Sequence, residues 1–182
     1  VRPVTIRRYC RSIRAFLKWC YESDYCPDYL KRVQLPKNDA RPKLPLYEDE
    51  VKRIDATFDL HTLTGKRNYC IVHLMLDCGL RTQEVVRLCM ENILYDRNIL
   101  QLIDSKGNKS RMTLVPDFLL KALSDYCSMA GVQNENLFFN LKARGEPLTG
   151  NGIKQLCQNL KEKSGVSRVH AHLFRHTFAT SY

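Results

Sequence analysis

The sequence predicts a mainly α-helical protein with one small antiparallel β-sheet, an α+β fold. Apolar residues recur at helical spacing through most of the chain, and three short strand-like segments follow one another between residues 92 and 115. A turn containing a glycine, at 106–109, separates the last two of these segments as in a hairpin. Hydrophobic residues make up 44% of the 182 residues, so a packed core is expected rather than disorder.

The first expected element is a helix over 4–21, whose apolar residues form one face that we expect to be buried. Four basic residues recur beside that face and, at ~100° per residue, fall within an arc of roughly 60°. They are Arg7, Arg11, Arg14 and Lys18. Such a stripe can follow a phosphate backbone or can simply be a solvated face. The lack of interleaved acids favours DNA.

A short second helix is expected over 24–35, after a turn at Pro27, and a proline-rich linker follows at 37–46. We therefore predict one domain part at 1–36 and a second domain at 47–182. The opening part has too few helices to close a core by itself. It is strongly basic, since residues 1–44 hold eleven Lys and Arg against four acids.

The second domain is expected to begin with a helix over 47–56, which is acidic in its first turn as helix N-termini favour. A nearly all-apolar helix over 66–78, ending at Gly79, should be buried. A helix is then expected over 82–89, followed by strands over 92–95, 98–103 and 111–115. Three further helices are expected: one over 117–130, one that begins at a Thr149 cap, and one that begins near His172.

Composition narrows the class of protein. The formal net charge of +10 favours a polyanionic partner over a small neutral ligand. No apolar run approaches the ~20 residues of a membrane span, and no export leader is recognisable. The eight cysteines include no Cys-x-x-Cys pair, so we expect reduced thiols in a cytoplasmic protein and neither a zinc site nor a disulfide scaffold.

Two segments carry candidate chemistry. In the first, 78–88, Arg81 opens a helix just after Gly79, where free backbone N–H groups and the helix dipole favour an anion. Glu84 lies one turn on and is placed to hold the Arg81 guanidinium. The alternative is a structural arginine that caps the helix junction.

In the second segment, 170–180, His172 and Arg175 lie one helical turn apart and share a face. This pairing suits proton transfer beside a phosphate, although the same residues can be satisfied structurally at a helix start. His172 and His176 also have the spacing of a helical zinc pair. No intervening glutamate, nearby cysteine or further carboxylate ligand completes that pattern, so no metal is expected. A zinc-dependent phosphoesterase is the corresponding alternative.

The turn between these segments carries Lys106 and Lys109, which form either a solvated tip or a lysine held against a backbone phosphate. The order of the motifs is informative: Gly-Leu-Arg-x-x-Glu, then Lys-Gly-Asn-Lys leading into Leu-Val-Pro, then His-Leu-x-Arg-His-x-Phe-Ala-Thr. This order resembles the tyrosine recombinase family, which includes phage and conjugative-transposon integrases and the Xer resolvases. The resemblance covers nearly the whole chain. It implies the end of a helical core-binding domain at 1–36 and most of a catalytic domain at 47–182.

The resemblance implies a role for each matched residue. Arg81 and Arg175 grip the scissile phosphate, Lys106 protonates the departing 5′-hydroxyl with Lys109 as the second choice, and His172 helps to deprotonate the nucleophile. Glu84 supports this set, and His176 is assigned a structural role.

The resemblance also implies double-stranded DNA as the partner, a homo-tetramer on that DNA, and no cofactor. No metal is needed because arginines and a lysine stabilise the charge, and no nucleotide is needed because a phosphotyrosyl link conserves the phosphodiester energy. The attacking tyrosine of the family is not matched in this chain. Tyr182 follows Arg175 too closely to be that tyrosine, so we expect a fragment that is truncated at its C-terminus and inactive alone. The alternative is a DNA-binding protein of the same fold that does not cut.

Overall fold

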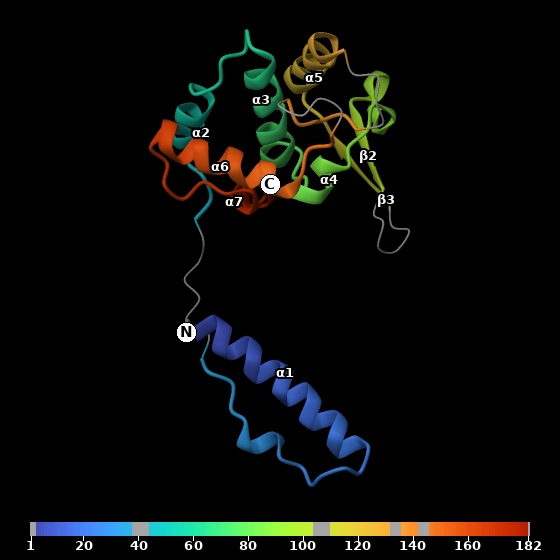
Figure 1. The fold of residues 1–182 in the computed structure, drawn as a ribbon, viewed down its shortest axis with the longest axis vertical. Helices are drawn as coiled ribbons and strands as arrows, with labels where there is room; N and C mark the ends of the chain where they lie inside the picture. The colour runs from blue at the N-terminus through green and yellow to red at the C-terminus, as the bar shows by residue number, and fades with distance from the viewer. Residues whose placement is uncertain (1–2, 38–43, 104–109, 132–135, 142–145, 182) are drawn as a thin grey trace. The chain divides into compact units, whose positions relative to one another are not determined.

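The computed structural model describes residues 3–37, 44–103, 110–131, 136–141 and 146–181. These residues form seven α-helices, three short 3-10 helices and one three-stranded antiparallel sheet (Figure 1), which confirms the predicted fold class. The chain divides into two compact units, Val1–Lys43 and Leu44–Tyr182. Each unit is described by itself.

The first unit consists of α1 (Pro3–Glu22) and a returning segment with a single 3-10 turn, η1 (Leu30–Arg32). The helix predicted over 24–35 is therefore wrong. Asp24 is left-handed, with φ 59°, and Pro27 lacks the N–H that a helix needs. The carbonyls of Leu30 and Val33 instead accept hydrogen bonds from Arg14 Nη1, at 3.0 and 2.8 Å.

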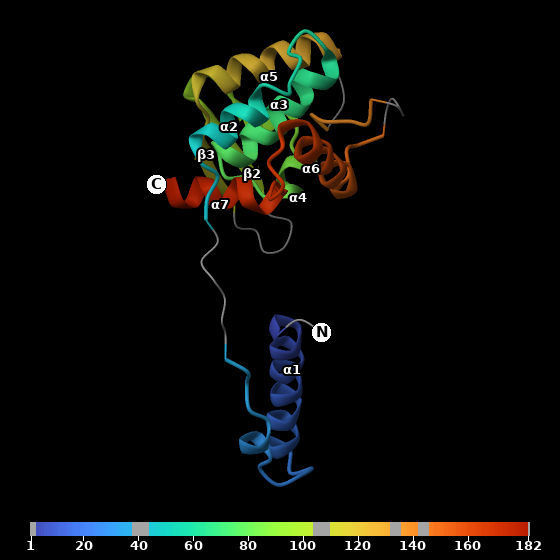
Figure 2. The same ribbon diagram turned by 90° about the vertical axis from the view of Figure 1, so that its left-hand side faces the viewer.

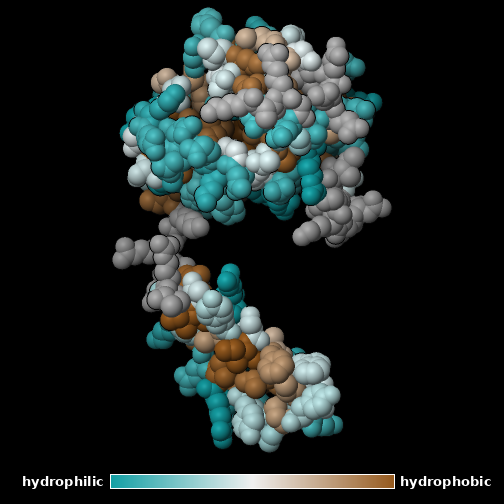
Figure 3. Space-filling model, viewed as in Figure 1, coloured by the Kyte–Doolittle hydropathy of each residue, from teal (hydrophilic) through white to brown (hydrophobic). Residues whose placement is uncertain are grey.

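The apolar face of α1 is largely exposed within this unit. Ile13, Phe16 and Trp19 are 49%, 60% and 53% exposed, and Cys20 is the buried residue of the helix. Figure 3 shows hydrophobic residues at the surface of this unit. One helix and one returning segment offer too little apolar surface to cover an amphipathic face of this length.

The second unit is built around α3 (Leu63–Leu76), in which every residue from Cys70 to Leu76 is buried, as the apolar run predicts. Helix α3 packs against α4, α5 and α7, while α6 packs against α2, α4 and α7 (Figures 1 and 2). The helices of this unit, besides α3, are α2 (Glu48–Asp55), α4 (Thr82–Val86), α5 (Asp117–Ala130), α6 (Gly150–Ser164) and α7 (Ala171–Ser181), with 3-10 turns η2 (Met90–Asn92) and η3 (Tyr95–Arg97).

Each predicted helix of the second unit is present: α5 has the predicted bounds, whereas α2, α3 and α4 have shifted ends. Thr62 caps α3 by accepting from the Gly65 N–H at 3.0 Å, so this helix begins earlier than predicted. Helix α4 is shorter than predicted and ends at Val86. Thr149 caps α6 as predicted, accepting from the Gly152 N–H.

The sheet has the order β1 (Ile93–Leu94), β2 (Ile99–Ile103), β3 (Ser110–Leu114), as the three strand-like segments predict. In the β2–β3 ladder Gln101 lies opposite Met112 and Leu102 opposite Arg111. Side chains alternate along β3, so Arg111 and Thr113 share the half-buried face and Met112 and Leu114 the exposed one. Thr113 Oγ1 donates to the Cys78 carbonyl at 3.2 Å, which ties this face to the end of α3.

A buried histidine joins α2 to α3. His73, 5% exposed, has Nε2 at 3.0 Å from Asp55 Oδ1 and Nδ1 at 2.6 Å from Asp77 Oδ2. A carboxylate group at each ring nitrogen favours the imidazolium form of His73, which can donate from both nitrogens. Burial lowers the pKa of His73, but hydrogen bonds to Asp55 and Asp77 outweigh it and raise the pKa to about 9.

Candidate functional site

The candidate site is centred on the turn between α3 and α4, where Gly79 has a left-handed φ of +64°. A Cβ at this position would lie 2.3 Å from the Phe178 ring of α7, so the close approach of α7 to this turn requires glycine. Arg175, also on α7, donates from Nη1 to the Gly79 carbonyl. The turn therefore brings the α3–α4 junction and α7 together.

Glu84 is the acceptor that organises the turn. Its Oε2 accepts the Arg81 backbone N–H at 2.6 Å, and its Oε1 accepts Arg81 Nη1 at 2.9 Å. The link expected between Glu84 and the Arg81 guanidinium is thus present. The same carboxylate thus also occupies the backbone N–H of Arg81, at the start of α4, which has five residues.

Arg111, on β3, is the residue that the sequence reasoning missed. Its Nη2 and Nε donate to the two oxygens of Glu84 at 2.7 and 3.3 Å, and Nη2 also lies 3.3 Å from the Gly79 carbonyl. The signal that could have revealed it is the alternation of β3, since a charged residue at a half-buried strand position needs a partner.

Three guanidiniums thus gather at this turn, Arg81 and Arg111 on the Glu84 carboxylate and Arg175 on the Gly79 carbonyl. Three positive charges stand there against one negative charge. Burial, followed by the charges of Arg81 and Arg111, lowers the pKa of Arg175, while Glu84 partly offsets this effect. Burial raises the pKa of Glu84, but the hydrogen bonds from Arg111 and Arg81 bring it below its ordinary value. We call Arg81, Arg111 and Arg175, together with Glu84, the arginine cluster. Its excess of positive charge and its fork-shaped donors suit a phosphate anion.

The other candidate residues are distributed as follows. His172 is exposed on α7, one turn before Arg175. His176 is half-buried on the same helix. Lys106 and Lys109 lie outside the described residues, between β2 and β3. Within the parts of the chain that the structure describes, no three histidines, cysteines or acids are grouped to hold a metal ion.

The basic stripe of α1 divides into two pairs. Arg7 donates to the Pro36 carbonyl and Arg14 to the carbonyls of Leu30 and Val33, so both guanidiniums hold the returning segment of the first unit. Arg11 and Lys18 are exposed, and Lys18 lies 3.5 Å from Glu22. An exposed pair of this kind is weak and open to exchange for an external anion.

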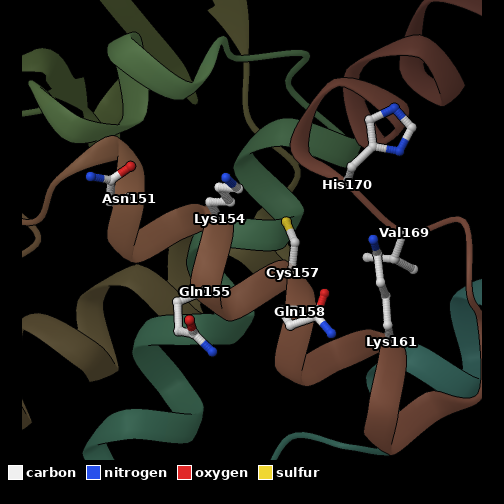
Figure 4. Close-up of a pocket in the computed structure, with 8 residues that line it drawn as sticks. All are labelled: Asn151, Lys154, Gln155, Cys157, Gln158, Lys161, Val169 and His170. Atoms are coloured by element: carbon white, nitrogen blue, oxygen red, sulfur yellow. The ribbon is translucent and has the colours of Figure 1, made fainter.

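A second basic surface lies along α6. A hollow of about 440 Å³ is bordered by two lysines, three side-chain amides and a histidine, which project around it (Figure 4). These residues are Lys154, Lys161, Asn151, Gln155, Gln158 and His170. Cys157 and Val169 complete the lining, and none of these described residues is acidic, so the two lysines make this surface too suitable for a negatively charged partner.

Together, the fold and the arginine cluster define an α+β domain that presents an excess of positive charge at a helix junction. The chain belongs to the phage integrase family, whose model matches residues 45–182. The tyrosine recombinases XerC of Bacillus pumilus and of Anoxybacillus flavithermus are 30% and 31% identical to it, over 97% of this chain. This chain spans about 60% of the length of these relatives.

Solved structures support the same fold. An integrase of the Tn1549 transposon, in complex with a circular intermediate DNA, superposes with a TM-score of 0.80 at 17% identity, over 97% of this chain and 66% of that chain. XerA recombinase superposes with a TM-score of 0.67 at 24% identity, over 100% of this chain and 69% of that chain. No helix among the described residues is long and apolar enough to span a membrane.

Proposed function

We propose that the chain is the DNA-binding and phosphate-activating part of a site-specific DNA recombinase. The observation that carries this proposal is the convergence of Arg81 and Arg175 on the Gly79–Glu84 turn. Two guanidiniums at one turn can hold the two non-bridging oxygens of a phosphodiester. They stabilise the negative charge that builds up as phosphorus becomes pentacoordinate.

In this proposal a tyrosine outside these 182 residues attacks phosphorus, and the 5′-oxygen of the next nucleotide leaves. A 3′-phosphotyrosyl bond replaces the phosphodiester bond, so strand exchange needs no nucleotide cofactor, and the arginines and the lysine stabilise the charge without a metal. His172 receives the proton of the tyrosine, and Lys106 supplies one to the departing oxygen, with Lys109 as the second candidate. Reversal of the step on a new strand completes recombination.

We assign a separate role to each predicted domain. Residues 1–36 belong to a helical domain that grips DNA, 37–46 link it, and 47–182 belong to the catalytic domain. In the first domain Arg11 and Lys18 contact the DNA backbone, while Arg7 and Arg14 support the structure. Four copies assemble on double-stranded DNA. The α6 surface, with Lys154 and Lys161, provides a further contact of the catalytic domain.

Salt dependence tests the DNA-binding part with the chain itself. Each phosphate neutralised by a lysine or arginine steepens the slope of log affinity against log salt by about 0.9. Replacing Arg11 and Lys18 with glutamine should flatten the slope by about 1.8. Replacing the exposed Lys52 and Arg53 of α2, which pair with Glu48 and Asp49, should leave it unchanged. An equal slope in both double variants would remove Arg11 and Lys18 from the interface.

Strand cleavage tests the enzymatic part. The gene should continue past Tyr182 into a tyrosine codon that completes the active site, and the complete protein should form a covalent complex with nicked site DNA. Arg175→Ala should abolish that complex while DNA binding persists. A stop codon directly after Tyr182 would instead favour the second candidate, a DNA-binding protein of the same fold that does not cut.

A further inference from the structure

The hydrogen bonds around Glu84 form a competition between two arginines. A carboxylate offers about four lone-pair positions, and here four donors fill them: the Arg81 N–H and Nη1, and the Arg111 Nη2 and Nε. Arg111 takes one position on each oxygen, so neither oxygen serves Arg81 alone. Only one N–H group of the Arg81 guanidinium, Nη1, is hydrogen-bonded to Glu84.

The exposures of the three side chains show which arginine is committed. Glu84 and Arg111 are 16% and 35% exposed, and Arg81 is 58% exposed. Arg111 is further fixed by the Gly79 carbonyl, the same carbonyl that accepts from Arg175. Arg111 is therefore the more buried partner of Glu84. The Arg81 guanidinium is more exposed, and most of its N–H donors are not used by Glu84, so they can bind an external anion.

We propose that Arg111 is a positioning residue for Arg81: by holding both oxygens of Glu84, it prevents this carboxylate from sequestering Arg81 in a two-point ion pair. The inference rests on the proposed function, because it takes Arg81 as a phosphate contact. Without Arg111, the Glu84 carboxylate faces Arg81 alone. The bidentate pairing that arginine and carboxylate prefer then uses the donors that a phosphate needs.

The rival interpretation is that Arg111 only fastens β3 to the α3–α4 turn. The two interpretations differ in how Glu84 behaves once Arg111 is gone. In the first, removing the Glu84 charge restores Arg81. In the second, it removes another structural contact and restores nothing.

The test uses the 182-residue chain and a fluorescent DNA duplex at low salt. In each background the Arg81 contribution is the ratio of Kd with and without Arg81→Gln. In the unaltered chain this ratio should be about tenfold, the size of one charge-assisted hydrogen bond. In Arg111→Gln it should fall to about twofold or less, because Glu84 then occupies Arg81. In Arg111→Gln/Glu84→Gln it should return to about tenfold.

Arg168 provides a matched control. It donates from Nε at 2.9 Å and from Nη2 to the two oxygens of Glu50, and the two side chains are 32% and 13% exposed, much like Arg111 and Glu84. It also binds the Leu44 and Pro45 carbonyls, so it is an arginine that fastens chain segments away from the site. Arg168→Gln should lower the unfolding midpoint and leave the Arg81 contribution at its original value.

The outcomes separate the two proposals. If Arg81→Gln has no effect on the affinity of the unaltered chain, the proposed phosphate contact fails. If the Arg81 contribution exists but is equal in Arg111→Gln, or is not restored by Glu84→Gln, the positioning role is overturned and the phosphate contact stands. Should Arg111→Gln fail to fold, Arg111→Lys takes its place in the cycle. A lysine cannot hold both carboxylate oxygens with a rigid fork, so the same fall and the same restoration are expected.

Discussion

The buried imidazolium of His73 gives the sharpest stability prediction. Replacing Asp55 and Asp77 with asparagine removes both carboxylates that accept from the ring, at 3.0 and 2.6 Å. Burial alone then acts on His73 and lowers its pKa below the ordinary 6.5. The ring should be neutral at pH 7 in this double variant and charged in the unaltered chain.

The magnitude follows from the shift. The pKa of His73 is about 9 in the folded chain and 6.5 when unperturbed, which corresponds to roughly 3 kcal/mol at 1.36 kcal/mol per unit. Because the folded pKa is raised, this contribution is fully present below pH 6.5 and is lost as pH rises through 9. The Tyr69 ring is tilted against His73 with the ring centroids 4.1 Å apart, and burial, followed by Asp55 and Asp77, raises the pKa of this tyrosine.

The assay is urea unfolding followed by far-UV circular dichroism at pH 6, 7, 8 and 9, on the unaltered chain and the double variant. Between pH 6.5 and 9 the free energy of unfolding of the unaltered chain should fall relative to the variant by about 1.4 kcal/mol per pH unit. A proton NMR titration of the His73 ring gives the pKa directly. A midpoint at or below 6.5 in the unaltered chain, or parallel stability profiles, would refute the reasoning.

Three further predictions concern the core. Gly79→Ala should lower the free energy of unfolding by more than the ~1–2 kcal/mol of a left-handed alanine, because the new Cβ meets the Phe178 ring at 2.3 Å. Gly131→Ala, with φ +59° and open space around it, should lower it only by this conformational part. Equal losses in urea unfolding would contradict this. Thr177→Val should lower the free energy of unfolding by about 1–3 kcal/mol. The Thr177 hydroxyl accepts from the buried Leu46 N–H at 2.9 Å, and valine would leave that N–H without its acceptor. An unchanged unfolding midpoint would be inconsistent with this hydrogen bond. The Cys70 thiol, whose pKa burial raises to about 12, should resist an aromatic disulfide reagent at pH 8 until urea is added, as followed by mass spectrometry; prompt labelling of the folded chain would show that it is not buried.

Much of the second unit could be predicted because its signals are local. The apolar run ending at Gly79 predicts the buried α3, and Thr149 predicts the start of α6. The first unit was less predictable. Apolar spacing over 24–35 favours a helix, but the left-handed Asp24 and Pro27 allow only one 3-10 turn. The apolar face of α1 carries the pattern of a buried face, yet nothing in that pattern says what covers it.

The candidate site was predictable only in part, because its geometry depends on contacts distant in sequence. Glu84 lies one turn from Arg81, so their hydrogen bond is accessible to sequence reasoning. Arg111 reaches the same carboxylate across 27 residues, through the register of β2 and β3. His73 was missed for a similar reason: it sits within an apolar run, and Asp55, one of its two partners, comes from another helix. The positions of Lys106 and Lys109 stay predictions.

The central claim is that Arg81 and Arg175 bind one and the same backbone phosphate. The most direct test is a titration of the ¹⁵N-labelled chain with a short DNA duplex, following the side-chain Nε–H signals of both arginines, assigned through Arg81→Lys and Arg175→Lys. Both signals should shift along one saturation curve, and substitution of either arginine should reduce the shift of the other. The claim would be contradicted if the signals of α1 saturate while the Arg81 and Arg175 signals do not shift, or if the two arginine signals follow separate saturation curves.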